Sequence, residues 1–310
     1  MAIATALAFV NSSGNGNDDT RKGITKNKIL VFSNAYHGAT LAFPMSLVVG
    51  NGDKGSGVIS SGGTAGPAAT NLPHDFVMAP YNNIPETRAI IDSLDPSNSL
   101  ATILFEPMQG AGGCRTATKE FASYLRQVAD EHCALLIADE VMTSRLGPAG
   151  LCVGYLGIKP DIMTLGKWVG GEGEGKGRLS HAGTFNNNLL TMVAGFEGLG
   201  IYTREKVEAL NALGNRLRGE VWSMLADRGI IGEHVRTGGE LSGGFEFVEM
   251  DTFDRKKREE TKTLPRMFVS GYGSLIAVRF TGEAAEAWQA LFYHHMLDEN
   301  IYLAMRATWL

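Results

Sequence analysis

Short apolar segments that end in polar residues recur along the first half of the chain, and they constrain its fold more than any other feature. They read KILVFS at 28–33, HDFVMAPYN at 74–82, LATILFE at 100–106, ALLIADEV at 134–141 and DIMTLGK at 161–167. Near-continuous apolar runs of this length are typical of strands that are buried on both faces. Helical patterns lie between them, at 85–94 and 117–132. This alternation predicts an α/β fold in which helices cover both faces of a mainly parallel sheet.

The pattern changes along the 310 residues and divides the chain into three parts. Residues 1–200 are expected to form a large α/β domain. It opens with a helix over residues 1–10, whose apolar sequence predicts that it is buried. An amphipathic helix over residues 201–228 is expected to link this domain to a smaller α+β domain over residues 229–310. With 44% apolar residues, the chain has enough material for a sizeable core.

Charge and cysteine content argue against several classes of protein. The net charge is −5 and the basic residues are scattered, so we expect no nucleic acid and no membrane surface as partner. No apolar stretch approaches the ~20 residues that a membrane span needs. Three cysteines without a Cys-x-x-Cys spacing predict neither a disulfide framework nor a zinc site. We therefore expect a soluble cytoplasmic protein without a structural metal.

Polar and aromatic residues follow the predicted strands, where parallel α/β sheets bind their ligands. In chain order these residues are Tyr36, His37, Glu106, Asp139, Glu140 and Lys167. Because the carboxyl ends of parallel strands meet at one edge of the sheet, these side chains are expected to line one cleft.

The chemistry of Asp139 and Lys167 suggests what that cleft holds. Asp139 closes a buried strand, so its charge needs a cation or hydrogen-bond donors nearby. A protonated pyridine nitrogen meets that need, and Lys167 could hold the aldehyde of the same ring as a Schiff base. Tyr36 could stack on one face of the ring and Val141 on the other.

Each of these residues also has a simpler interpretation when taken alone. Asp139 and Glu140 could be a helix N-cap and its solvated neighbour, or ligands of magnesium. Tyr36 and His37 could pack within a loop, and Lys167 could be a surface lysine. The combination in chain order is more specific than any member.

A second lysine lies close by in a different pattern. Lys176 ends a Gly-x-x-x-x-Gly-Lys sequence that lacks one residue of a nucleotide-binding P-loop. Gly177 stands where that motif needs a hydroxyl, and Glu172 and Glu174 place negative charge where phosphates would lie. The P-loop interpretation is therefore the weaker one.

Several segments, in chain order, resemble motifs of the class III pyridoxal-phosphate-dependent aminotransferases. They are KILVFSNAYHGAT, ILFEPMQGAGG, LLIADEVMTSR, DIMTLGKWVGG and HAGTFNNNLLTMVAG. The similarity is greatest to the branch that holds β-amino-acid aminotransferases and glutamate-1-semialdehyde 2,1-aminomutases. The resemblance implies a fold-type I transferase, pyridoxal 5'-phosphate as cofactor, and a homodimer with its active site at the subunit interface.

Carried over residue by residue, the resemblance assigns roles around the cofactor ring. Lys167 would form the Schiff base with the cofactor and move the proton. Asp139 would pair with the pyridine nitrogen. Tyr36 would stack on the ring with His37 beside it, and Val141 would pack on the opposite face.

The resemblance also assigns residues farther from the ring. Glu106 would belong to the polar network near Asp139, Thr184 would reach the phosphate of the neighbouring subunit's cofactor, and Arg306 would bind a substrate carboxylate. The implied reaction moves an amino group between an amino acid, with β-amino acids among the candidates, and a 2-oxo acid. An internal amino shift in glutamate 1-semialdehyde is the alternative.

The chain departs from the family pattern in three places. It begins after the position where the family has a phosphate-binding turn of Ser-Gly-Thr-Glu-Ala type, it is shortened near 171–180, and it ends where related chains continue. We therefore expect both terminal parts of the family fold to be incomplete here. A catalytically degenerate relative stays open as a further alternative.

Overall fold

The computed structural model describes residues 2–12, 26–38, 75–94, 100–167, 188–228, 266–281 and 284–303. The chain divides into two compact units, which are treated separately below. The first is Met1–Pro107 with Ala117–Thr203, and the second is Met108–Thr116 with Arg204–Leu310. The expected three-part division did not include this grouping of residues 108–116 with the C-terminal part.

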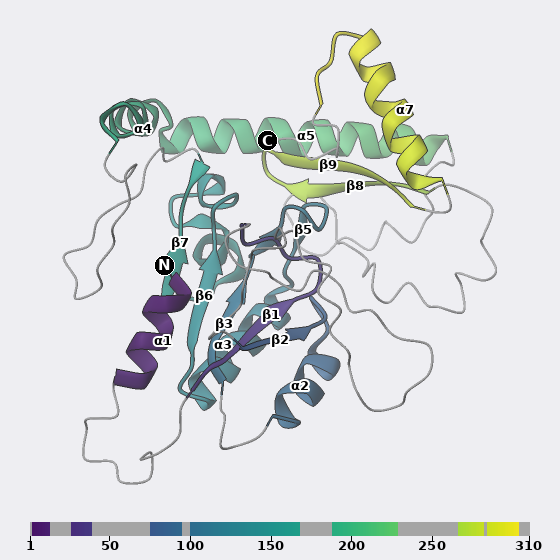
Figure 1. Ribbon diagram of the computed structural model, residues 1–310. Helices are drawn as coiled ribbons and strands as arrows, with labels where there is room; N and C mark the ends of the chain where they lie inside the picture. Colours follow the sequence, from purple (N-terminus) through teal and green to yellow (C-terminus); the bar gives the residue numbers. More distant parts are fainter. Residues whose placement is uncertain are drawn as a thin grey trace. The chain divides into compact units, whose positions relative to one another are not determined.

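A five-stranded sheet forms the centre of the first unit, in the order β2-β1-β3-β6-β7 (Figure 1). Its strands are β1 (Lys28–Phe32), β2 (Asp75–Ala79), β3 (Leu100–Phe105), β6 (Leu135–Asp139) and β7 (Ile162–Thr164). Every neighbouring pair runs parallel, which confirms the expected parallel sheet. The chain places β2 on one side of β1 and β3 on the other. In α/β proteins, ligands bind at the carboxyl edge of the sheet near such a change of direction.

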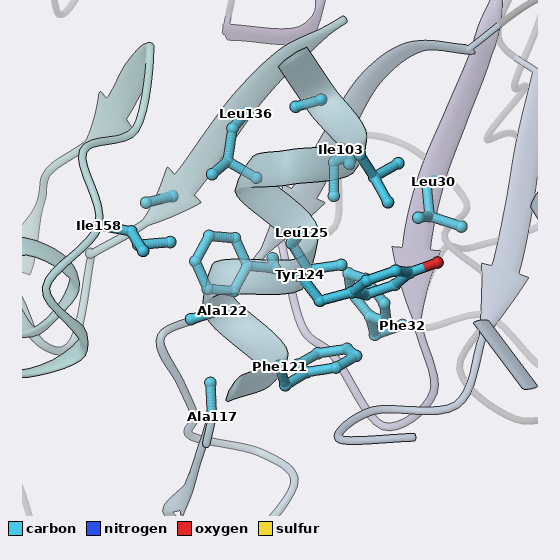
Figure 2. Close-up of a cluster of buried hydrophobic side chains, with 14 of the residues drawn as sticks. Leu30, Phe32, Ile103, Ala117, Phe121, Ala122, Tyr124, Leu125, Leu136 and Ile158 are labelled. Atoms are coloured by element: carbon cyan, nitrogen blue, oxygen red, sulfur yellow. The ribbon is translucent and has the colours of Figure 1, made fainter. Parts of the chain in front are cut away.

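Alternating side chains bury both faces of the sheet. Leu30 and Phe32 of β1 belong to one apolar cluster, and Ile29 and Val31 belong to another. The first cluster packs against helix α3 (Lys119–Glu131), and the second packs against helix α1 (Ala2–Ser12). Figure 2 shows the α3 side chains lying against residues of the strands, among them Ile103 and Leu136. Helices therefore cover both faces, as the apolar runs predict.

Three aromatic rings connect the core to the carboxyl edge. Phe32, Tyr81 and Phe121 pack edge to face, with ring centroids 5.3 to 6.0 Å apart. The Tyr81 hydroxyl is buried and donates to the backbone oxygen of Glu106 at 2.7 Å. This contact fixes the backbone at the end of β3, where the candidate site residue Glu106 follows.

Helix α1 is buried on one face only. Ile3 and Ala6 lie in the core, whereas the Phe9 side chain is 58% exposed. The expectation of a buried helix therefore holds for one face of α1 only. The apolar residues of this segment do not all face the sheet, and sequence hydropathy alone could not assign them to one side.

Side chains cap two of the helices that pack against the sheet. Asn83 accepts a hydrogen bond from Glu86 N at the start of α2 (Ile84–Asp92). Thr118 accepts one from Phe121 N, at 3.1 Å, at the start of α3. Both caps satisfy amides that have no partner within the helix.

We expect Thr118→Ala to lower the free energy of unfolding by about 1 kcal/mol, because Phe121 N loses its capping oxygen. Urea denaturation measures the change. Ser123→Ala, on the exposed side of the same helix, is the control and is expected to change stability by less than about 0.5 kcal/mol. Equal effects of the two substitutions would contradict the capping role.

The second unit is built on helix α5 (Arg204–Asp227). Its described strands are the antiparallel pair β8 (Arg266–Tyr272) and β9 (Leu275–Thr281) and the short pair β4 (Met108–Gln109) and β5 (Arg115–Thr116), and helix α7 (Ala285–Asp298) follows β9. Apolar residues of β8 and β9 pack against Trp222 of α5 and Phe292 of α7. Ser270 of β8 donates to Gly113 O at 2.5 Å, which ties the β4–β5 hairpin to the same unit.

Asparagine side chains on α5 hold the β8–β9 turn. Asn211 Oδ1 accepts from Ser274 N, and Asn215 Oδ1 accepts from Gly273 N. Gly273 has φ +55, and a Cβ there would lie 2.5 Å from Asn211 Oδ1, so a glycine fits this turn best. Among the described helices, none is long and apolar enough to cross a membrane.

Candidate active site

A hydrogen-bond network surrounds Asp139 at the carboxyl end of β6. Asp139 Oδ2 lies 2.7 Å from His37 Nδ1, and Oδ1 accepts from Thr164 Oγ1 at 3.0 Å and from Val141 N at 3.2 Å. The side chains of His37 and Asp139 are 3% and 12% exposed. His37 follows β1, Val141 follows β6 and Thr164 ends β7. Residues far apart in the chain thus meet around the Asp139 carboxylate.

This network favours the charged form of Asp139. Burial is the largest influence and by itself raises the pKa of the carboxyl group. The hydrogen bond and charge of His37 oppose burial, together with the donors Thr164 and Val141 N, and the net result is a pKa below the ordinary 3.8. Asp139 is therefore a buried anion at neutral pH.

The depressed pKa of Asp139 predicts how stability depends on pH. The folded chain binds this proton less readily than the unfolded chain, so the stabilisation is fully present above pH 3.8 and is lost as the pH falls through the folded pKa. Asp139→Asn removes this dependence. Urea denaturation at a series of pH values should show wild type and variant differing most above pH 3.8 and converging below it. A difference that stays constant with pH would show that the pKa is not depressed.

Glu106 and Tyr36 meet at the next position along the edge. The Glu106 side chain is buried, and its Oε2 accepts a hydrogen bond from Tyr36 N at 3.0 Å. The Tyr36 side chain itself is 46% exposed. This contact fixes the loop after β1 while it leaves the Tyr36 ring available to a ligand.

Lys167 follows β7 and is the last residue described in this part of the chain. It is exposed and has φ +56, a conformation that residues other than glycine seldom adopt and that is frequent at functional sites. The preceding residue packs closely, since a Cβ on Gly166 would lie 3.3 Å from Val141 Cγ1. Val141 thus contacts both Asp139, through its N–H, and the segment that carries Lys167.

The structure brings several of the expected residues together and does not describe others. His37 contacts Asp139, Tyr36 contacts Glu106, and Val141 packs beside Gly166. Thr184, Arg306 and the alternative lysine Lys176 lie outside the described residues. The roles that the resemblance implies for all of these residues stay predictions.

The sequence did not indicate the roles of two residues of this network. Thr164 pairs in register with Asp139, but nothing in the segment DIMTLGK marks its hydroxyl as a partner. The sequence places Glu140 among the residues expected to line the cleft and, taken alone, suggests a solvated neighbour or a metal ligand, but it does not indicate a role in holding the backbone. The solvated interpretation is wrong, because Glu140 is fully buried and accepts from Leu151 N and Cys152 N. Within the described residues there is no group of His, Cys, Asp and Glu suited to a metal ion.

Comparison with known proteins identifies the family. The model of the class III aminotransferases matches residues 2–266. The chain is 38% identical over 262 residues to the β-phenylalanine transaminase of Variovorax paradoxus, covering 79% of this chain and 52% of the relative. It is 32% identical over 222 residues to the glutamate-1-semialdehyde 2,1-aminomutase of Methanococcus vannielii, covering 64% and 49%. The chain belongs to the class III aminotransferase family, which confirms the resemblance.

A solved structure confirms the fold class. The β-phenylalanine aminotransferase of Variovorax paradoxus superposes with a TM-score of 0.69 at 31% identity, over 99% of this chain and 61% of that one. The fold is thus that of the fold-type I pyridoxal-phosphate-dependent transferases. The chain spans about half the length of the curated relatives quoted above.

Proposed function

We propose that the chain binds pyridoxal 5'-phosphate at Lys167 and transfers an amino group between an amino acid and a 2-oxo acid. The buried Asp139 carboxylate carries this proposal. It lies at the carboxyl edge of a parallel sheet, is held by three donors, and is kept anionic by His37 and its other partners. A buried anion of this kind fits the protonated ring nitrogen of the cofactor.

The other residues of the edge also fit this cofactor. When bound, the cofactor would supply an aldehyde for a lysine and a ring that withdraws electrons from the substrate. Lys167 Nζ would accept the proton of the amine-bearing carbon of the amino acid and pass it to the carbon that carried the cofactor's aldehyde, which is the 1,3-proton shift that amino transfer needs. The exposed ring of Tyr36 would stack on the cofactor, and Val141 would exclude water from the opposite face.

Two further contacts rest on the family resemblance alone. Thr184 is proposed to bind the cofactor phosphate across a subunit interface, and Arg306 is proposed to bind a substrate carboxylate. Glu106 would act on the loop after β1, since its carboxylate holds Tyr36 N.

β-Amino acids are the first candidate substrates, because the β-phenylalanine transaminase of Variovorax paradoxus is 38% identical to this chain. The full chain, supplied with the cofactor, is to be incubated with β-phenylalanine and 2-oxoglutarate while glutamate formation is measured. Glutamate 1-semialdehyde alone is the parallel substrate, since the similarity to the Methanococcus vannielii enzyme supports the aminomutase alternative.

The outcomes separate the alternatives. Glutamate formation supports the transaminase, and rearrangement of the semialdehyde without an acceptor supports the aminomutase. If the cofactor binds and neither substrate reacts, the proposed substrates are wrong. If no cofactor binds at millimolar concentration, the chain is a degenerate member of the family.

A homodimer is proposed as the assembly. Helix α4 (Leu189–Ile201) exposes apolar side chains, among them Leu189 at 75%, Leu190 at 80% and Phe196 at 76%. Apolar side chains gathered in this way usually mark an interaction surface. Light scattering on the full chain is expected to give twice the 33.3 kDa of one chain, and a value of one chain mass would contradict the dimer.

We also propose a cytoplasmic location. The cysteines support it, since Cys114, Cys133 and Cys152 form no disulfide.

A further inference from the structure

Glu140 is a buried carboxylate that the proposed amino transfer does not use. It follows Asp139 directly and is fully buried. Its Oε1 accepts from Cys152 N at 2.6 Å, and its Oε2 accepts from Leu151 N at 3.1 Å and from the Thr143 hydroxyl. The side chain thereby caps the helical segment that continues into η4 (Cys152–Leu156).

The backbone of Glu140 makes two more connections. Its N–H donates to Thr164 O of β7 at 3.0 Å, and its carbonyl accepts from Ser144 N at 2.9 Å, at the start of the short helix η3 (Ser144–Leu146). Glu140 thus connects the carboxyl end of β6 to the end of β7, to η3 and to the helical segment that contains η4.

The Glu140 carboxylate lies close to the backbone of Gly150. Gly150 has φ +67, and a Cβ there would lie 2.7 Å from Glu140 Oε1. A glycine is needed both for this backbone conformation and for the close approach of the carboxylate. The Glu140 carboxylate therefore occupies the space that a side chain at residue 150 would need.

We propose that Glu140 is a positioning residue. It stands between Asp139 and Val141 in the chain, and by binding residues 143–152 it holds both neighbours in place. This inference rests on the proposed function for its consequence in catalysis. Its structural basis is independent, because Thr164 bonds both to Glu140 N through its carbonyl and to Asp139 Oδ1 through its hydroxyl. A shift of Glu140 would therefore move the donors that hold Asp139.

The electrostatics of Glu140 differ from those of Asp139. Burial is the main influence and raises the pKa of Glu140, although Thr143 and the two backbone amides lower it in part. Glu140→Gln keeps the shape of the side chain but replaces an acceptor oxygen with an amide donor. At least one of its donors then faces an N–H group in place of an oxygen.

The test reads the position of Asp139 without the cofactor. In the full chain labelled with ¹⁵N-histidine, the imidazole signal of His37, assigned with His37→Gln, reports the hydrogen bond to Asp139. Glu140→Gln and Gly150→Ala are each expected to shift or broaden this signal. Cofactor affinity is expected to fall at least about tenfold in both variants, equivalent to about 1.4 kcal/mol.

Thr102→Val is the matched control. Thr102 is also fully buried in the sheet, and its hydroxyl donates to Leu135 O at the amino end of β6, away from the site. It is expected to destabilise the chain while the His37 signal and the cofactor affinity stay unchanged. A folded Glu140→Gln variant with the wild-type His37 signal would overturn the proposal.

If Glu140→Gln does not fold, Glu140→Asp takes its place with the same readout, because the shorter side chain cannot reach both backbone amides. If the wild-type chain binds no cofactor, the proposed function fails. The histidine signal then still decides whether Glu140 positions Asp139.

Discussion

Lys167→Ala is expected to abolish the visible absorbance band of the bound cofactor and to lower amino transfer at least about 10³-fold. The substitution removes both the amine that bonds to the cofactor and the proton carrier, and general acid–base catalysis alone contributes about 10²–10⁴-fold. Absorbance titration with the cofactor and a single-turnover assay measure the two losses. The left-handed backbone at Lys167 is itself a reason to expect a functional role.

Lys176→Ala is the matched control for that substitution. Lys176 lies in the same glycine-rich stretch and belongs to the P-loop pattern, so the proposed function predicts an unchanged band and unchanged turnover. If Lys176→Ala loses the band and Lys167→Ala keeps it, the assignment of the lysine is wrong.

Asp139→Asn is expected to lower the rate of amino transfer by about ten- to a hundredfold. The substitution replaces a charge-assisted hydrogen bond, worth about 1.5–3 kcal/mol, with a neutral one, and about 1.4 kcal/mol corresponds to a factor of ten in rate. Asparagine has nearly the same shape, so the fold should survive. The measurement is the single-turnover rate with saturating cofactor, which separates the electronic effect from weaker binding.

Asp161→Asn makes the same chemical change at the opposite edge of the sheet. Asp161 precedes β7 and accepts from Leu136 N and Arg126, so it supports the sheet without reaching the site. It is expected to affect stability while the rate stays unchanged. Equal losses of rate in the two variants would mean that Asp139 acts only through the stability of the fold.

The central sheet could be predicted from the sequence because its strands are nearly continuous apolar runs. The runs at 28–33, 100–106 and 134–141 each contain the observed strand, and the carboxyl ends carry the expected polar residues. The physical reason is burial on both faces, which leaves a strong signal in a short segment. The apolar sequence of helix α1 is a weaker signal of burial, since Phe9 of this helix faces solvent.

The hydrogen-bond partners within the site were harder to predict from the sequence, because they depend on the register between neighbouring strands. Thr164 is opposite Asp139 only because β6 and β7 pair in one alignment, and a sequence does not state that alignment. Glu140 follows the strand like a solvent-facing residue, yet the chain returns at residues 150–152 and buries it. Gly150 is the sequence feature that accompanies this burial, but its role becomes apparent only when the structure shows the Glu140 carboxylate beside it.

The grouping of residues 108–116 was beyond prediction for a similar reason. The strands β4 and β5 have two residues each, too few for any periodicity. Their place in the second unit depends on contacts such as that of Ser270 with Gly113, which are more than a hundred residues apart in the chain.

Borohydride reduction of the cofactor-loaded full chain, followed by peptide mass spectrometry, tests the central claim most directly. Reduction makes the bond between lysine and cofactor permanent, so the modified residue can be located. The proposed function predicts a pyridoxyl group on the peptide that contains Lys167 and none after reduction of Lys167→Ala. A modification at another lysine in place of Lys167, or no modification of the wild-type chain, would contradict it.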